Sequence, residues 1–330
     1  MALPSDLTGP IELALARSAT QLPGRAAGAG SCWRYELKWD GYRAVVIREG
    51  RRTRIWSRQG KDLSDRFPDI LTTIAAQVSG DCVIDGELVV WDQDRLSFGA
   101  LQQRLVNPAA KAASLAAARP ASFVAFDLLA VGHRDLRRHT WTARRAALEH
   151  LSAGWTPPLQ LSPVTADVAE AQEWMSLYYQ AGIEGIVAKD AESAYRQGHR
   201  GWWKVKHRET LEVIVGAVIG PAHSPTAVIG ARYDGDDLVV VGRTGDLTPT
   251  QDRELGPLLH ASADHPWPAT TTAGRWGSSG AAVAWTRVEP CVVVEVAADA
   301  ARQGVQYRHP LRYVRPPRRP LPRQRRAGGS

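Results

Sequence analysis

The sequence predicts an α+β protein of two domains, and three observations lead to this prediction. A chain of 330 residues is about twice the length of a typical single domain. Over residues 31–206, short runs in which apolar and polar residues alternate are separated by longer stretches with helical periodicity. After residue 206 the apolar runs are almost all strand-like. With 44% hydrophobic residues, the chain has enough apolar material for a core in each domain.

The first domain is expected at 31–207, after an irregular segment at 1–30 that contains Pro10, Pro23 and a glycine-rich run. Alternation with period two predicts its strands, because neighbouring side chains of a strand point to opposite faces. The predicted strands are 33–40, 42–50, 53–58, 82–92, 122–130, 183–190 and 201–207. The predicted helices are 65–78, 100–118, 142–151 and 167–182. This mixture within one domain indicates an α+β fold.

A second domain is expected at 208–318. Its predicted elements are strands at 211–220, 227–235, 237–244, 289–299 and 304–314, and one helix at 251–263. Residues 234–237, with the sequence Asp-Gly-Asp-Asp, lie between two apolar runs and predict a hairpin turn. About five short strands with one helix fit a small β-barrel such as an OB-fold.

Positive charge is concentrated at the C-terminal end. The formal net charge is +7, and residues 301–330 hold nine arginines and no acidic residue. The 41 basic residues of the whole chain therefore fall to 32 for residues 1–300, against 34 acidic residues. We expect 319–330 to be a basic, disordered tail. Such a tail can bind a polyanion, or it can be a solvated end without a partner, and the sequence leaves both interpretations open.

The cysteines and the N-terminal residues exclude two classes of protein. Three cysteines, far apart and odd in number, do not form a disulfide scaffold or a zinc-type spacing. The first thirty residues contain no long apolar run, so they predict neither a secretory signal nor a membrane span. A reduced, cytoplasmic protein is the expectation.

Lysine is rare in this chain, and its rarity draws attention to individual lysines. Only six of the 41 basic residues are lysines. Arginine stays protonated in proteins, whereas a lysine amine can lose its proton and act as a nucleophile. Four lysines lie in predicted strands and are candidates for such a role: Lys38, Lys189, Lys204 and Lys206. The other two need no explanation beyond chance.

Lys38 is the candidate nucleophile. In an extended strand Lys38 and Asp40 share a face. A free lysine amine has a pKa of about 10.4 and is protonated at neutral pH, but burial and neighbouring cations lower that pKa. The cations expected near it are Arg43, Arg58, Lys204 and Lys206. The alternative is a Lys–Asp pair on the surface of an edge strand, and the strand taken by itself favours that alternative.

Charged residues recur at spacing two further along the chain. Asp85 and Glu87 stand among valine, isoleucine and leucine, and carboxylates in such surroundings need a cation, hydrogen-bond donors or a divalent metal. Lys204 and Lys206 form a like-charged pair, which a polyphosphate between them would stabilise. By its apolar surroundings alone, Phe126 is expected in the core.

Together and in this order, these segments resemble those of the ATP-dependent DNA ligases, within the covalent nucleotidyltransferase superfamily. The resemblance covers residues 31–210 and starts with the Lys-x-Asp-Gly-x-Arg segment at 38–43. Further matching segments are 57–62, 67–68, 85–87, 126–127, 184–189, 193–200 and 204–206, with 242–245, 289–296 and 307–310 in the second half. The likeness is to the compact actinobacterial C-type ligases and to the ligase domain of bacterial end-joining enzymes.

The resemblance implies an adenylation (nucleotidyltransferase) domain followed by an OB-fold domain. It implies that Lys38 attacks the α-phosphate of ATP and forms a lysine–AMP intermediate. The residues implied to bind the nucleotide are Glu36 and Phe126 at adenine, Glu87 at the ribose, Arg43 and Arg58 near the ribose and phosphates, and Lys204 and Lys206 at the α-phosphate. This replaces the core interpretation of Phe126. Glu87 and Glu184 are implied to hold Mg²⁺ or Mn²⁺.

The implied substrate is nicked double-stranded DNA, whose 5′-phosphate accepts AMP before the 3′-hydroxyl seals the nick. Residues implied to contact DNA are Arg43, Arg58, Arg200 and Arg315. The resemblance also implies a monomer in the bacterial cytoplasm, near the nucleoid, that acts in DNA repair with other repair proteins. Two alternatives are an RNA ligase or other covalent nucleotidyltransferase, and a catalytically weak relative that binds DNA ends.

The sequence departs from the ligase pattern near its C-terminal end. These ligases usually end with an Arg-x-Asp-Lys motif that orients the pyrophosphate during self-adenylylation. Here residues 315–320 read Arg-Pro-Pro-Arg-Arg-Pro, so Arg315 is present and the Asp–Lys pair is absent. We therefore expect an enzyme that loads ATP slowly or is isolated partly adenylylated.

Overall fold

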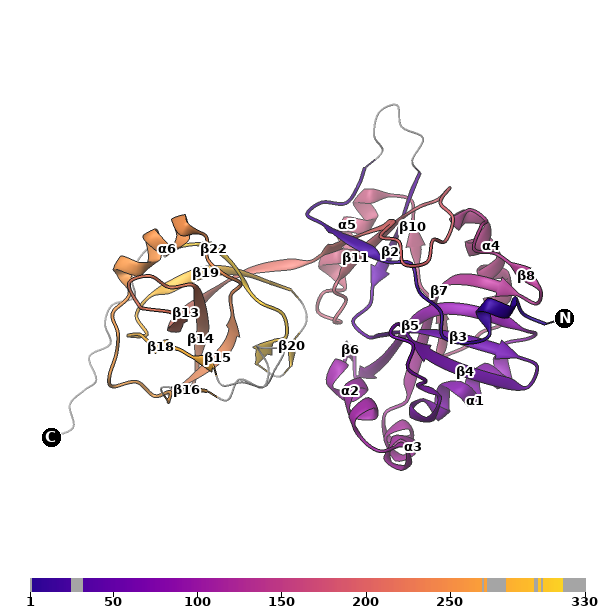
Figure 1. Cartoon of the computed structure of the whole chain (residues 1–330), viewed down its shortest axis with the longest axis horizontal. Coiled ribbons are helices and arrows are strands. Elements are labelled where there is room, and N and C mark those ends of the chain that lie inside the picture. The colour runs from indigo at the N-terminus through magenta and orange to yellow at the C-terminus, as the bar shows by residue number, and fades with distance from the viewer. Residues whose placement is uncertain are drawn as a thin grey trace. The chain divides into compact units, whose positions relative to one another are not determined.

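The chain forms two compact units, Met1–His207 and Arg208–Ser330 (Figure 1). The structure is a computed structural model and describes residues 2–24, 32–268, 270–271, 283–299, 302–303 and 305–316. The expected basic tail at 319–330 lies outside these residues. Each unit has its own core of buried apolar side chains. Within the described residues, no helix has the length and apolar character needed to cross a membrane.

The larger sheet of the first unit has seven strands in the order β4-β3-β5-β7-β8, with β6 paired to β5 and β9 paired to β7. These strands are β3 (Tyr42–Glu49), β4 (Arg52–Ser57), β5 (Cys82–Asp92), β6 (Arg95–Leu96), β7 (Ala121–Val131), β8 (Arg134–Asp135) and β9 (Leu159–Leu161). The helices near it are α1 (Pro68–Gln77), α2 (Phe98–Val106), α3 (Ala109–Ala118) and α4 (Trp141–Ser152). Ile70, Ile74, Leu101 and Leu148 from three of these helices are buried against the strands, and their burial holds the helices on the sheet.

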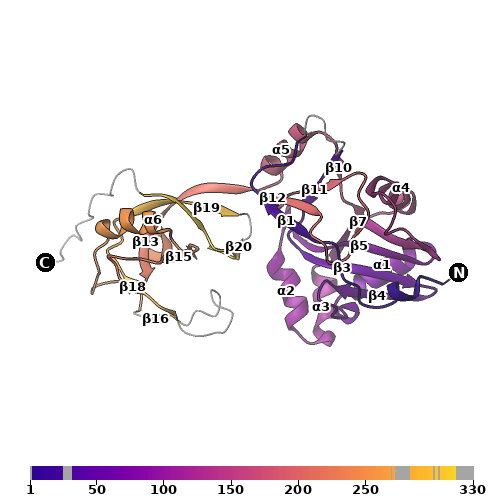
Figure 2. The same cartoon turned by 45° about the horizontal axis from the view of Figure 1, so that its top comes forward.

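The smaller sheet of the first unit has the order β1-β12-β11-β2-β10. Its strands are β1 (Ala16–Ala19), β2 (Trp33–Lys38), β10 (Val164–Thr165), β11 (Gly185–Asp190) and β12 (Trp202–Lys206). Helix α5 (Val168–Leu177) contacts β2 and β11 (Figure 2). The sheet therefore joins strands from the beginning, middle and end of the unit, and it places β2, β11 and β12 side by side.

The predicted strands of the first domain are all present, but two other expectations are corrected. The helix predicted at 100–118 is split into α2 and α3, because Pro108 has no N–H to donate and interrupts a helix. The segment at 1–30 is not irregular throughout. Leu7 and Leu13 are buried, and β1 pairs in parallel with β12. The pattern misled because the strand that pairs with β1 lies far away in the sequence.

The second unit is built on one antiparallel sheet in the order β15-β14-β13-β19-β22, with β18 paired to β13. Its strands are β13 (Arg208–Ile219), β14 (Ala227–Asp234), β15 (Asp237–Arg243), β18 (Thr286–Arg287), β19 (Val293–Asp299) and β22 (Arg312–Arg315). Two separate two-stranded ribbons are formed by β16 (Thr270–Thr271) with β17 (Val283–Ala284) and by β20 (Arg302–Gln303) with β21 (Gln306–Tyr307). Leu311, beside β22, donates its N–H to Arg243 of β15 at 2.8 Å and accepts from Gly245 at 2.9 Å. The two outer strands therefore meet, which closes the sheet around its core.

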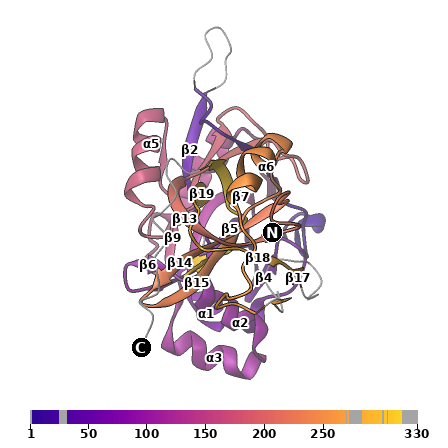
Figure 3. The ribbon, with the colours of Figure 1, turned by 90° about the vertical axis from the view of Figure 1, so that its left-hand side faces the viewer.

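The helix of the second unit is shorter than predicted. Helix α6 covers Pro249–Leu255, and a single 3₁₀ turn at Gly256–Leu258 follows it. Its start is fixed by a capping box, in which Thr248 and Gln251 each bond the other's backbone N–H. Figures 1 and 3 show α6 at one end of the closed sheet.

Candidate active site

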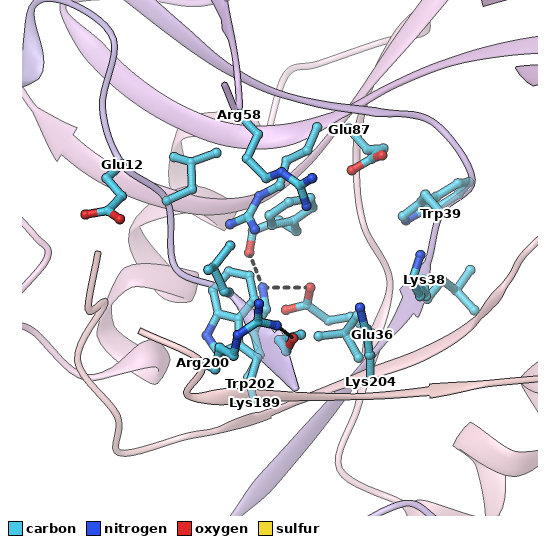
Figure 4. A pocket seen from close by; sticks show the side chains of 17 residues that line it. Glu12, Glu36, Lys38, Trp39, Arg58, Glu87, Lys189, Arg200, Trp202 and Lys204 are labelled. Atoms are coloured by element: carbon cyan, nitrogen blue, oxygen red, sulfur yellow. Dashed lines mark hydrogen bonds and ion pairs between the residues drawn. The ribbon is translucent and has the colours of Figure 1, made fainter. Parts of the chain in front are cut away.

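A pocket of about 500 Å³ opens in the first unit (Figure 4). It is lined by Glu12, Leu13, Leu15, Ala16, Glu36, Leu37, Lys38, Trp39, Arg43, Arg58, Glu87, Phe126, Val187, Lys189, Arg200, Trp202 and Lys204. Eight of the eleven site residues predicted from the sequence are among them. Glu184 and Lys206 adjoin the pocket through Lys38, and Arg315 belongs to the second unit. The structure thus gathers the predicted nucleotide-binding residues around one cavity.

Lys38 stands at the end of β2 and forms an ion pair with Glu184. The other carboxylate oxygen of Glu184 lies 3.6 Å from the Lys206 amine. Burial by itself lowers the pKa of Lys38, but the carboxylates of Glu184, Glu87 and Asp40, of which Glu184 contributes most, together outweigh burial and raise the pKa above the ordinary value. The expectation that burial and nearby cations depress this pKa is therefore wrong, because it did not include the Glu184 carboxylate as the nearest charge.

The position of Glu184 follows from the strand register. β11 lies between β2 and β12, and Gly185 is opposite Lys38 on one side and Lys206 on the other. The backbone of Gly185 has a φ of +150°, and a Cβ there would lie 2.1 Å from the carbonyl oxygen of Val205. Only glycine allows β11 to approach β12 so closely. That approach brings the Glu184 carboxylate between the amines of two neighbouring strands.

Lys204 and Lys206 lie on the same face of β12, as their spacing predicts. Burial, together with the charges of Lys38 and Lys206, lowers the pKa of Lys204. Three amines therefore share one corner of the first unit. Glu184 offsets part of their charge, and a further anionic group beside the three amines would be stabilised, which is the arrangement that a phosphate site requires.

Glu87 comes from β5 and lines the pocket. Burial raises its pKa to about 8, although Lys38 and Arg43 oppose that change. Gly41 permits this packing, because a Cβ at Gly41 would lie 2.2 Å from the carbonyl oxygen of Leu88 and 2.8 Å from Cγ of Glu87. Within the described residues, no group of three or more His, Cys, Asp or Glu side chains is arranged to hold a metal by itself.

Arg43 lines the pocket, but its guanidinium is engaged by the protein. Nε and Nη2 donate to the two carboxylate oxygens of Asp85 at 3.0 and 2.6 Å, and Nη1 donates to the carbonyl of Ala14 at 2.6 Å. Asp85 is fully buried. A bidentate pair of this kind is rigid. Arg43 therefore fastens the N-terminal segment to the larger sheet, a role that the sequence did not indicate.

Tyr195 completes this attachment. Its hydroxyl donates to Asp85 at 2.7 Å and accepts from the N–H of Ala14 at 3.1 Å. The neighbours of Ala14 in the chain, Glu12, Leu13, Leu15 and Ala16, line the pocket. A residue from the far end of the unit thus holds the N-terminal segment against the nucleotide pocket.

We expect the variant Tyr195→Phe to lose about 1 to 3 kcal/mol of unfolding free energy, because Asp85 and the Ala14 N–H each lose a buried partner. Urea unfolding of the first unit measures this change. Tyr178→Phe is the matched control, since Tyr178 is 38% exposed, and a change within about 0.5 kcal/mol is expected there. Equal losses in both variants would contradict the role given to Tyr195.

Phe126 is half-buried and lines the pocket, with its ring edge-to-face on Trp202 at 6.2 Å. Lys189 lies beside both rings, with its amine 4.6 Å from the centroid of Phe126 and 4.3 Å from that of Trp202. The sequence marked Lys189 as a candidate but gave it no role, and it did not identify Trp202 or Trp39 as pocket residues. Trp39 directly follows β2, and Lys189 and Trp202 lie within β11 and β12. Their closeness to the charged residues of these strands was the signal that could have identified them as pocket residues.

The predicted DNA-contacting arginines differ in their surroundings. Arg58 and Arg200 are exposed and line the pocket, and Arg200 donates to the carbonyl of Ala16 at 3.4 Å. Arg315, in the second unit, is exposed and forms an ion pair with Glu295 of β19. Two cations at the pocket are thus accessible to an anionic ligand.

Comparison with known proteins gives a consistent set of relatives. A sequence model of the ATP dependent DNA ligase domain matches residues 14–206. DNA ligase C of Mycobacterium tuberculosis is 32% identical over 329 residues, 93% of this chain and 89% of that protein. The multifunctional non-homologous end joining protein LigD of Mycobacterium bovis is 30% identical over 317 residues, 90% of this chain and 38% of that protein. A solved structure, mycobacterial DNA ligase D complexed with ATP and MES, has a TM-score of 0.50 and 27% identity, covering 96% of both chains.

Proposed function

Because the chain belongs to the ATP-dependent DNA ligase family, as its sequence segments predicted, we propose that the pocket of the first unit binds ATP and that Lys38 accepts the AMP group. The enzyme is a DNA ligase that seals nicks. The observation that carries the site assignment is the pairing of Lys38 and Lys206 with the Glu184 carboxylate beside the pocket that Lys38 and Lys204 line.

Three transfers account for sealing. The neutral amine of Lys38 attacks the α-phosphorus of ATP; an N–P bond forms, the bond to pyrophosphate breaks, and the amine loses a proton. A 5′-phosphate oxygen of the nick then attacks the same phosphorus, and Lys38 regains its proton as the N–P bond breaks. Finally the 3′-hydroxyl attacks the 5′-phosphate and AMP leaves. Charge neutralisation and in-line positioning are the main requirements of such steps.

We assign each of these requirements to particular residues at the pocket. The Glu184 carboxylate pairs with the protonated Lys38 amine and is the nearest group that can take its proton. Lys204 and Lys206 are placed to neutralise the α-phosphate. Phe126 is placed to stack on adenine, and Glu36 to accept from its edge. Arg58 and Arg200 are placed at the pocket for the phosphates of ATP or of the nick.

Glu87 and Glu184 fit a divalent cation. The half-buried Glu87 carboxyl has a pKa raised to about 8 by loss of solvation, and no hydrogen bond or ion pair with another described residue offsets that loss. A cation beside it would stabilise its ionised form. Mg²⁺ is commonly held by one or two carboxylates together with substrate phosphates, so a full protein cage is not needed. When bound, Mg²⁺ or Mn²⁺ would neutralise charge on the phosphates.

We also propose that the second unit is an OB-fold domain over 208–318 that contacts nicked DNA, with Arg315 among its contacts. The closed antiparallel sheet, with Leu311 bonded to Arg243, supports the barrel. The missing Asp–Lys pair after Arg315 supports slow ATP loading. Action as a monomer, and with other repair proteins, stays a prediction.

The metal site is tested by self-adenylylation with ATP, followed by the mass of the intact protein. EDTA is expected to stop formation of the AMP adduct, and added Mg²⁺ or Mn²⁺ to restore it. Glu184→Gln is expected to slow adduct formation by at least about 100-fold, because it removes a charge at both the metal and the Lys38 amine. Glu192→Gln, at an exposed position, is the control. Adduct formation in EDTA at the normal rate would overturn the metal assignment, and labelling by GTP rather than ATP would overturn the ATP site.

A further inference from the structure

His207 is the last residue of the first unit, and it adjoins the residues proposed to act on the α-phosphate. β12 ends at Lys206 and β13, the first strand of the second unit, begins at Arg208, so His207 lies between the two strands. Whatever position the second unit takes, the chain therefore leaves the first unit directly after one of the three amines of the proposed phosphate site.

Hydrogen bonds fix the backbone of Glu184 on both sides. Its N–H donates to the carbonyl of Lys38 at 2.9 Å, and its carbonyl accepts from the N–H of His207 at 2.9 Å. Its carboxylate forms ion pairs with the amines of Lys38 and Lys206. The place of this carboxylate between two amines therefore depends in part on the backbone of His207.

The ring of His207 packs on the ring of Tyr179. Their centroids lie 4.4 Å apart, and their planes are tilted by 43°. Tyr179 follows helix α5 and is 5% exposed. The turn that leads from it to Glu184 is closed by a hydrogen bond from the Gly182 N–H to the carbonyl of Tyr179 at 2.9 Å. The ring contact therefore attaches His207 to a buried residue of the loop that carries Glu184.

We propose that His207 is a positioning residue for self-adenylylation, because its ring, packed on Tyr179, keeps the end of β12 against β11. In this position β12 and β11 present Lys206 and Glu184 to Lys38. The inference rests on the nucleotide site proposed above.

The physical reason is that the end of a strand frays when nothing anchors it. Fraying at His207 would break its bond to the Glu184 carbonyl and let the carboxylate move away from Lys38. Group transfer requires aligned reacting atoms, and a displacement of about 1 Å lowers its rate by up to about 100-fold. His207 acts in this way through its neighbours, without contact to the nucleotide.

The test follows self-adenylylation of the full chain as a single turnover, from the mass of the intact protein against time. AMP already on the protein is first removed with pyrophosphate, which reverses the reaction. The amplitude then gives the active fraction, the rate constant at saturating ATP reports alignment at Lys38, and the ATP concentration at half the maximal rate reports binding.

His207→Ala is expected to lower the rate constant by about 10- to 100-fold. Its amplitude and half-saturating ATP concentration are expected within about threefold of wild type, because the residues proposed to contact the base and ribose lie on β2, β5 and β7. His133→Ala, at an exposed position between β7 and β8, is the control and should be unchanged. A lower amplitude with an unchanged rate constant means that His207 only stabilises the fold, and it overturns the proposal.

Two further variants identify which property of the His207 side chain is needed. His207→Phe keeps a ring that can pack on Tyr179, whereas His207→Gln keeps hydrogen-bonding groups and removes the ring. The Phe variant is expected to keep the rate constant within about threefold of wild type, and the Gln variant to be as slow as His207→Ala. A fast Gln variant or a slow Phe variant overturns the ring contact as the cause.

Tyr179→Leu removes the contact from its other side. In a double-mutant cycle with His207→Ala, the double variant is expected to be as slow as the slower single variant, to within about threefold. Losses that multiply show that the two rings act independently, and they overturn the proposal. Where Tyr179→Leu does not fold, the three His207 variants decide the question.

The outcomes distinguish this inference from the site assignment. A wild-type protein that forms no AMP adduct with ATP contradicts both. Adduct formation by the wild type, with an equal rate constant in His207→Ala, overturns only the role of His207.

Discussion

Lys38→Arg is expected to abolish self-adenylylation, with a loss in rate of roughly ten-thousandfold or more. Arginine keeps the positive charge and can keep the pair with Glu184, but it does not lose a proton at any accessible pH and so supplies no nucleophile. The variant should remain folded, because arginine can keep the ion pair with Glu184. Mass measurement of the protein after incubation with ATP and Mg²⁺ shows the adduct directly, and sealing of a nicked duplex shows the overall reaction.

A pre-adenylylated nick provides the internal control for Lys38→Arg. Sealing of such a nick needs the attack of the 3′-hydroxyl but no nucleophile from the protein, so the variant should seal it to within about tenfold of the wild-type rate. Lys111→Arg, outside the pocket, controls for the substitution itself. Formation of an AMP adduct on Lys38→Arg at the wild-type rate would place the nucleophile at another residue and contradict the assignment of Lys38.

Local patterns in the sequence predicted much of the first unit because its strands alternate regularly. β2, β5 and β12 each carry chemistry-bearing residues at spacing two, and these residues do lie on one face of their strand. The family resemblance then assigned roles to residues that the pattern alone left ambiguous. Phe126 is the plainest case, since its apolar surroundings predicted core and the structure places it at the pocket.

Relations between distant strands could not be read from the sequence. The pairing of β1 with β12 joins residues about 185 positions apart, so nothing near Ala16 indicated a strand. The Glu184 carboxylate beside Lys38 depends on the order β12-β11-β2, and without that order the pKa of Lys38 was expected to fall when it rises. Partners fixed by sheet order are a property of the whole fold, and local periodicity carries no information about them.

Arg144→Met is expected to lower the unfolding free energy of the first unit by about 3 to 5 kcal/mol, the second large effect that the structure indicates. Arg144 and Asp127 form a bidentate pair at 2.7 and 3.0 Å, with side chains 0% and 1% exposed. The substitution leaves Asp127 buried without its cation. Arg144 also donates to the carbonyls of His139 and Ser193 at 2.8 and 3.0 Å, so the loop before Tyr195 loses an anchor.

Calorimetry is expected to show a melting temperature lower by about 10 °C for the transition of the first unit in Arg144→Met. Asp92→Ala provides the control, because Asp92 and Arg119 form an ion pair at 3.9 Å with both side chains 54% exposed, and such pairs contribute little. The pair rather than the lost volume is responsible if Asp127→Leu, added to Arg144→Met, restores part of the loss, since both buried charges are then gone. An unchanged melting temperature in Arg144→Met would mean that Asp127 finds another partner, and it would contradict the stabilising role given to the pair.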